Sequence, residues 1–103
     1  MSVTMRILQR FDVRKEKEFL DLERQFAALE RARPDLPQGR RMKPISGHEP
    51  CNTLVWEAVF PSLDAAKKAL DTFAADVAHE ELFAKQSKLF QSVKIEFYEN
   101  LDC

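Results

Sequence analysis

The sequence has little glycine, almost no excess charge and no long apolar run, and each of these scarcities excludes a class of protein. Only two Gly occur among 103 residues, beside a hydrophobic fraction of 45 %, so disorder is not expected. No stretch approaches the roughly 20 apolar residues that a membrane helix needs. The N-terminal segment is interrupted by Arg6 and Arg10 and does not fit a signal peptide. We therefore expect one soluble domain over residues 1–103.

Cysteine and net charge are equally limited. Cys51 is expected in a turn and Cys103 is the last residue, so they form no disulfide framework, and a reducing cytoplasm is the expected location. The net charge of −1 argues against binding to nucleic acid, because a polyanion binder needs surplus Lys and Arg. No CxxC or HExxH spacing occurs, so the sequence predicts neither a metal site nor a permanent cofactor. The basic residues of the segment 31–43 are interpreted as a solvated loop and strand end: Arg31, Arg33, Arg40, Arg41 and Lys43.

Hydrophobic periodicity predicts the secondary structure. Strands are expected at 3–11, 40–46, 53–60 and 92–99. Asp12 and Ser62 are suited to cap two helices, the first over 14–33 and the second up to a break near Ala78–His79, and a shorter helix then ends near Phe90. The inner stripe of the second helix is expected to comprise Ala66, Ala69, Leu70, Phe73 and Val77. On the first helix the apolar stripe is Phe19, Leu22, Phe26 and Leu29, and the face expected in water carries Glu16, Lys17, Glu23, Arg24 and Glu30.

The order strand, helix, strand, strand, helix, strand predicts an α+β domain with the ferredoxin-like β-α-β-β-α-β fold. It implies a four-stranded antiparallel sheet in the order 4-1-3-2, with helices on one face. Pro44 cannot donate to a ladder, so strand 40–46 is expected at the sheet edge. Trp56 is expected in the core beneath the helices, rather than as a platform for a cofactor. Its expected neighbours are Ile7, Phe26, Phe73 and Phe97, and Val93 and Ile95 are expected to point inward as well.

The face that the helices leave open is expected to be neither fully polar nor fully apolar. It carries Leu8, Val55 and Val59 among charged side chains. Two such faces related by a two-fold axis would enclose a partly polar cavity, so we expect a homodimer through the open sheet face. The alternative is a monomer with a few exposed valines.

Two segments resemble NIPSNAP-like proteins. The run Leu54-Val55-Trp56-Glu57-Ala58, followed by Ser62-Leu63-Asp64-Ala65-Ala66, is similar to the junction between the third strand and the following helix in that family. The stretch Glu80-Glu81-Leu82-Phe83-Ala84-Lys85, leading into Gln91-Ser92-Val93, is similar to its short helix and last strand. The resemblance covers the half of the chain from Asn52 onward. It implies a dimeric α+β barrel, the superfamily that includes the antibiotic-biosynthesis monooxygenases. Haem-degrading relatives use an Asn on the first strand, and the strand expected at 3–11 contains no Asn.

Six side chains of the open face are the candidate ligand-binding residues: Arg6, Arg10, Glu57, Lys94, Glu96 and Tyr98. Arginine could hold an acidic ligand, Glu57 could act as a base, and Tyr98 could donate a hydrogen bond. If a ligand pocket exists, we expect it to contain Arg6, Arg10, Glu57 or Tyr98. The alternative interpretation is cross-strand ion pairing, which stabilises a sheet without any ligand.

These observations leave three functions open. The first is binding of a small, acidic or aromatic organic molecule in the cavity between two sheets. The second is a cofactor-independent monooxygenase or isomerase that acts on a small cyclic substrate. The third is a non-catalytic structural or interaction module. An RNA-recognition domain is not expected, because it needs aromatic side chains on the open faces of strands one and three.

Overall fold

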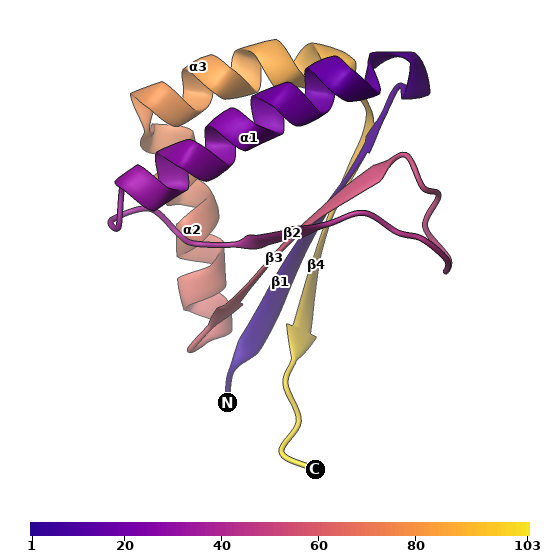
Figure 1. Ribbon diagram of the computed structural model, residues 1–103. Coiled ribbons are helices and arrows are strands. Elements are labelled where there is room, and N and C mark those ends of the chain that lie inside the picture. Colours follow the sequence, from indigo (N-terminus) through magenta and orange to yellow (C-terminus); the bar gives the residue numbers. More distant parts are fainter.

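The computed structural model describes all residues 1–103 and has the predicted order of elements (Figure 1). The strands are β1 (Val3–Phe11), β2 (Arg40–Met42), β3 (Thr53–Phe60) and β4 (Phe90–Glu99), and the helices are α1 (Glu16–Ala32), α2 (Leu63–Ala75) and α3 (Val77–Gln86). The short 3-10 helices η1 (Val13–Lys15) and η2 (Ser87–Leu89) precede α1 and β4. All strand pairs are antiparallel, in the order β2-β3-β1-β4. The predicted ferredoxin-like α+β fold is confirmed.

The core lies between the sheet and the helices, as the alternation of β1 and β3 predicts. Its main cluster brings strand residues together with the inner stripe of α2: Val3, Met5, Trp56, Ala58, Ala66, Ala69 and Phe73. A second cluster consists of Phe11, Phe19 and Leu54, in which the rings of Phe11 and Phe19 stack with centroids 4.6 Å apart. These clusters join α1 and α2 to the two central strands.

Capping residues fix where the helices begin. The Ser62 hydroxyl accepts a hydrogen bond from the Ala65 amide at 3.1 Å, so it caps α2 as predicted. The Asp12 carboxylate accepts from the Arg14 amide and caps η1, and α1 itself begins only at Glu16. The break between the last two helices lies at Asp76, earlier than the predicted Ala78–His79, because Asp76 caps α3 by accepting from the His79 amide at 2.9 Å.

Three further predictions about the elements are corrected by the structure. Val77 opens α3 and is exposed, so it is not part of the inner stripe of α2. The second strand ends at Met42 instead of residue 46, and Pro44 lies beyond it in the loop 43–52. The edge position of this strand is nevertheless confirmed.

The helix-facing side of β4 is only partly covered. Val93, Ile95 and Phe97 lie on the helix-facing side as predicted, but they are between 37 % and 46 % exposed, so the prediction that they are packed into the core is wrong. The reason is that α2 packs over β1 and β3, while α3 packs against α1 and α2 rather than on the sheet. Phe97 therefore does not bury Trp56, although Trp56 is in the core as predicted. No helix combines the length and the apolar character that a membrane crossing requires.

Candidate functional site

The six residues predicted to bind a ligand do lie on one face of the sheet. The register places Arg6 opposite both Glu57 on β3 and Glu96 on β4, and Glu57 opposite Arg40 on β2. Charges of alternating sign thus cross the sheet in one row, from Arg40 through Glu57 and Arg6 to Glu96. Lys94, Arg10 and Tyr98 lie on the same face in neighbouring rows, because they are an even number of residues from members of that row.

Most of these charges already have partners within the chain. An Arg40 nitrogen lies 2.8 Å from the Glu57 carboxylate, and an Arg6 nitrogen lies 4.0 Å from Glu96. The Tyr98 hydroxyl donates a 2.7 Å hydrogen bond to Glu96, and this bond, with the loss of hydration, raises the pKa of the phenol. This pattern is what cross-strand ion pairing predicts, and it leaves Glu57 bound to a guanidinium rather than free to act as a base.

The loop 43–52 covers one end of this open face. It leaves β2 at one edge of the sheet, yet its Glu49 lies 3.5 Å from Lys94 on β4 at the other edge. The loop must therefore pass over β3 and β1, where Val55 and Leu8 are paired with each other and buried. Val55 and Leu8 are thus already covered within one chain, and the expectation that they await a partner is corrected. Val59, in contrast, is 65 % exposed.

The main apolar pocket lies on the opposite, helical side of the sheet. It has a volume of about 410 Å³ and opens where β4 is uncovered. Its apolar walls come from all three helices and from β1, β3 and β4: Ile7, Phe26, Trp56, Leu70, Phe73, Ala74, Phe83, Phe90, Val93 and Ile95. None of Arg6, Arg10, Glu57, Lys94 or Tyr98 lines it. The pocket therefore lies on the side of the sheet opposite to the one predicted for ligand binding.

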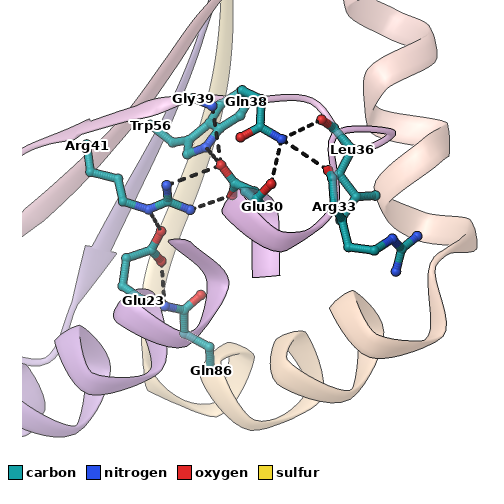
Figure 2. Close-up of polar contacts among 9 residues, drawn as sticks. All are labelled: Glu23, Glu30, Arg33, Leu36, Gln38, Gly39, Arg41, Trp56 and Gln86. Atoms are coloured by element: carbon teal, nitrogen blue, oxygen red, sulfur yellow. Dashed lines mark hydrogen bonds and ion pairs between the residues drawn. The ribbon is translucent and has the colours of Figure 1, made fainter. Parts of the chain in front are cut away.

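One wall of the pocket belongs to a buried polar cluster of Glu23, Glu30, Arg41, Trp56 and Gln86, of which all but Arg41 line the pocket (Figure 2). The Arg41 guanidinium bridges the two carboxylates, with Nε 2.5 Å from Glu23 and the terminal nitrogens 2.5 and 3.2 Å from Glu30. Gln86 donates to the other Glu23 oxygen at 2.8 Å, and the Trp56 Nε1–H donates to Glu30 at 3.4 Å. Every carboxylate oxygen of the cluster accepts at least one hydrogen bond.

The pKa of Arg41 reflects this environment. Burial by itself lowers the pKa of the guanidinium, but the hydrogen bonds and negative charges of Glu30 and Glu23 outweigh burial and raise it overall. Arg41 therefore remains charged inside the protein. Its neighbour Arg40 points to the other face of the sheet, because side chains alternate along a strand.

The sequence interpretation of Glu23, Glu30 and Arg41 was wrong. Glu23 and Glu30 were expected in water and Arg41 in a solvated strand end, yet both glutamates are buried and Arg41 is largely so. A signal for the glutamates does exist, because Phe19, Glu23, Phe26 and Glu30 follow spacings of four, three and four and so share one helix face. The sequence does not show that Arg41 meets this face.

Gly39 brings the chain close enough to complete the cluster. Its amide donates to Glu30 at 3.2 Å, and a Cβ atom at this position would lie 2.0 Å from Cε2 of Trp56. Any larger residue would collide with the indole ring, so the close approach requires glycine. Next to it, the Gln38 amide donates to the carbonyls of Glu30, Arg33 and Leu36, which satisfies the end of α1.

Two polar atoms in the pocket lining have no hydrogen-bond partner. His79 Nδ1 is buried, and its ring stacks on Phe73 with centroids 4.5 Å apart and lies 4.9 Å from Phe26. The nearest carboxylate oxygen, on Glu80, is 3.5 Å away. Gln9 Oε1 is also buried without a partner. Unpartnered buried polar atoms are costly, and both of these atoms belong to side chains that line the pocket.

The fold is shared with proteins of known structure. No protein-family model matches the sequence, and no curated protein sequence matches it. The chain is similar to a NIPSNAP family protein from Agrobacterium tumefaciens, with a TM-score of 0.82 and 18 % identity over 99 % of this chain and 95 % of that one. An uncharacterised NIPSNAP domain protein from Burkholderia xenovorans gives a TM-score of 0.76 and 19 % identity over 99 % and 96 % of the two chains.

A third solved structure extends the comparison to an enzyme. SnoaB, a cofactor-independent oxygenase from Streptomyces nogalater, gives a TM-score of 0.65 and 17 % identity over 99 % of this chain and 95 % of its own. At these identities the similarity shows a common fold. It confirms the α+β fold that the resemblance implied, a fold that this chain shares with NIPSNAP proteins of known structure.

Proposed function

We propose that the protein binds a small, largely apolar organic molecule in the pocket between the sheet and its helices. The observation that carries the proposal is the combination of aromatic walls with two buried polar atoms, on Gln9 and His79, that lack partners. Ligand pockets are typically apolar with a few polar groups that fix orientation. The volume of about 410 Å³ suits a molecule with one or two rings.

A second candidate function is a cofactor-independent monooxygenase or isomerase acting on a cyclic substrate. SnoaB shares the fold and is described as a cofactor-independent oxygenase. His79 supports this candidate, because its imidazole lines the pocket and could accept a substrate proton there. Its stacking on Phe73 holds the imidazole in one orientation.

The pocket proposal is tested by methyl NMR with 2-phenylethanol, a neutral aromatic probe. We expect the methyl resonances of Ile7, Leu70 and Ile95, which line the pocket, to shift on titration, and that of Val59 on the open face to stay in place. Ala74→Phe should weaken binding, because Ala74 lines the pocket and the added ring takes up its space.

Ala75→Phe is the matched control, because Ala75 is also exposed on α2 but does not line the pocket. It should leave the titration unchanged. Shifts confined to Val55 and Val59 would contradict the proposal and return the site to the open sheet face.

We also propose that the protein forms a homodimer through its open sheet face. Val59 at 65 % and Ile45 at 100 % exposure, the second in the loop 43–52, are apolar groups that a partner could cover. Burial of such surface gains about 25 cal/mol per Å². The row of alternating charges from Arg40 to Glu96 suits a partner related by a two-fold axis, because the partner's row runs in the opposite direction and sets each charge against one of opposite sign.

Both cysteines are exposed and unpaired, which supports a reducing cytoplasm as the proposed location.

Sedimentation equilibrium at micromolar concentration tests the dimer. We expect a dimeric mass for the unmodified chain and a monomeric mass for Val59→Asp, because a carboxylate in the interface would lose its hydration. Val55→Asp is unsuitable, since Val55 is buried within the single chain. Val13→Asp is the control, because Val13 is 66 % exposed but lies in η1, away from the sheet face. A monomeric mass for the unmodified chain would refute the dimer.

A further inference from the structure

We infer that the pocket selects a positively charged aromatic molecule, such as a protonated arylalkylamine, over the corresponding carboxylic acid. The inference rests on the proposed function, because it names the chemical class that the pocket between the sheet and the helices would take. It reverses the expectation, drawn from the arginines of the open face, that the ligand could be acidic.

The pocket lining contains carboxylates but no lysine or arginine. Glu23 and Glu30 belong to its buried polar wall, and Glu80 lies closer to solvent at 46 % side-chain exposure. The one lining side chain that can become cationic is His79, whose Nδ1 lies 3.5 Å from Glu80. Arg41 stands behind the wall and does not line the pocket.

The charges of the buried wall do not balance. Glu23 and Glu30 carry two negative charges, and Arg41, the cation that bridges them, carries one positive charge. One negative charge therefore remains in excess, at carboxylates whose side chains are only 8 % and 6 % exposed. The neutral donors Gln86, Trp56 and Gly39 stabilise it without cancelling it. A ligand ammonium group would neutralise this charge, and a ligand carboxylate would double it.

The aromatic walls favour the same ligand class. Trp56, Phe26, Phe73 and Phe83 all line the pocket, with Trp56 edge-on to Phe73 at 5.7 Å. Aromatic faces attract cations through their quadrupole, and they also pack against the ring of an arylalkylamine. Cation and ring thus find complementary surfaces within one pocket, whereas a carboxylate would face electron-rich rings and other carboxylates, with no lysine or arginine to balance its charge.

The test compares three probes with a phenylalkyl skeleton at pH 7: phenethylamine, which is protonated, 2-phenylethanol, which is neutral, and 3-phenylpropionate, which is an anion. Trp56 is the only tryptophan and lines the pocket, so its fluorescence reports occupancy directly. We expect phenethylamine to bind about tenfold more tightly than 2-phenylethanol, the size of effect expected for a charge-assisted hydrogen bond. We expect 3-phenylpropionate to bind more weakly than either.

Two variants assign the preference to the carboxylates. Glu23→Gln leaves one carboxylate facing one guanidinium, so it should reduce phenethylamine affinity about tenfold and change that of 2-phenylethanol little. Glu80→Gln should reduce phenethylamine affinity about two- to threefold, because Glu80 is half exposed and screened by water. Glu80→Gln also keeps the test decisive if Glu23→Gln fails to fold.

Glu81→Gln is the matched control, because Glu81 is the next residue on α3 and does not line the pocket. It should leave all three affinities unchanged. The inference is overturned if the anion binds as tightly as the amine, or if Glu80→Gln and a folded Glu23→Gln both keep the full amine affinity. Failure of all three probes to bind would instead overturn the proposed function, and the inference with it.

Discussion

Replacing Arg41 by methionine is expected to lower the free energy of unfolding by about 3–5 kcal/mol, the cost typical of breaking a buried ion pair by removing one partner. The methionine side chain retains much of the volume of arginine but leaves Glu23 and Glu30 facing each other without a cation. Their side chains are only 8 % and 6 % exposed, so hydration compensates poorly for the lost guanidinium. Urea unfolding followed by Trp56 fluorescence would measure the loss.

The pH dependence of this loss has a definite sign. The pKa of Arg41 is raised in the folded protein above an ordinary value that is already high, so its contribution to stability is present at every pH up to strongly alkaline conditions. The difference in unfolding free energy between Arg41→Met and the unmodified protein should therefore not decline between pH 7 and pH 9, because Arg41 stays charged over this range.

Arg40→Met is the control for Arg41→Met. Arg40 also pairs with a carboxylate, Glu57, but its side chain is 72 % exposed. We expect it to cost about 1 kcal/mol or less, with little dependence on pH. Equal losses for the two variants would mean that the buried cluster contributes no more than a surface ion pair.

Replacing Trp56 by alanine is the second large change, with an expected loss of about 3–5 kcal/mol. Trp56 is 4 % exposed, packs edge-on to Phe73, and contributes the Nε1–H that Glu30 accepts. The truncation leaves a cavity in the main core cluster, and this cavity adjoins the pocket that Trp56 lines. The urea midpoint, followed by circular dichroism, would report it.

Two comparisons separate packing from other effects of Trp56→Ala. Val59→Ala, on the opposite face of the same strand, should change stability by no more than about 0.5 kcal/mol, because Val59 is mostly exposed. Gly39→Ala should be destabilising in the unmodified chain, where its Cβ meets the indole ring, but nearly neutral together with Trp56→Ala. A midpoint that barely moves in Trp56→Ala would count against its place in the core.

The fold could be predicted because its signals are local and repeated. Alternation in β1 and β3 defines two faces, Ser62 marks the start of a helix, and Pro44 is incompatible with a central strand. The ends of elements were less predictable, because Asp76 caps a new helix where the apolar spacing continues through the break. Local chemistry and periodicity compete at such places, and the hydrogen bond from His79 decides the outcome.

The candidate site was much harder to predict, because it depends on how far elements stand from one another. Glu23 and Glu30 look like surface residues until Arg41, from a strand more than ten residues away, reaches between them. The pocket exists because the helices cover β4 only in part, and no single segment encodes that gap. The candidate residues at Arg6, Glu57, Glu96 and Tyr98 lie on the open face as predicted, but they form ion pairs and hydrogen bonds within the chain.

The edge strand β2 is held from both sides by ion pairs that respond differently to ionic strength. Arg40 binds Glu57 on the solvent side, and Arg41 binds Glu23 and Glu30 inside. Dissolved salt weakens the interaction between exposed charges over a screening length of a few ångströms to about 10 Å, and it weakens the interaction between buried charges much less. Without these ion pairs, the register of β2 against β3 would be weakly fixed, because β2 has three residues and Met42 is the only apolar one. Raising the salt concentration therefore weakens one of its two attachments and leaves the other, so β2 keeps its alignment where surface pairing alone would let it slip.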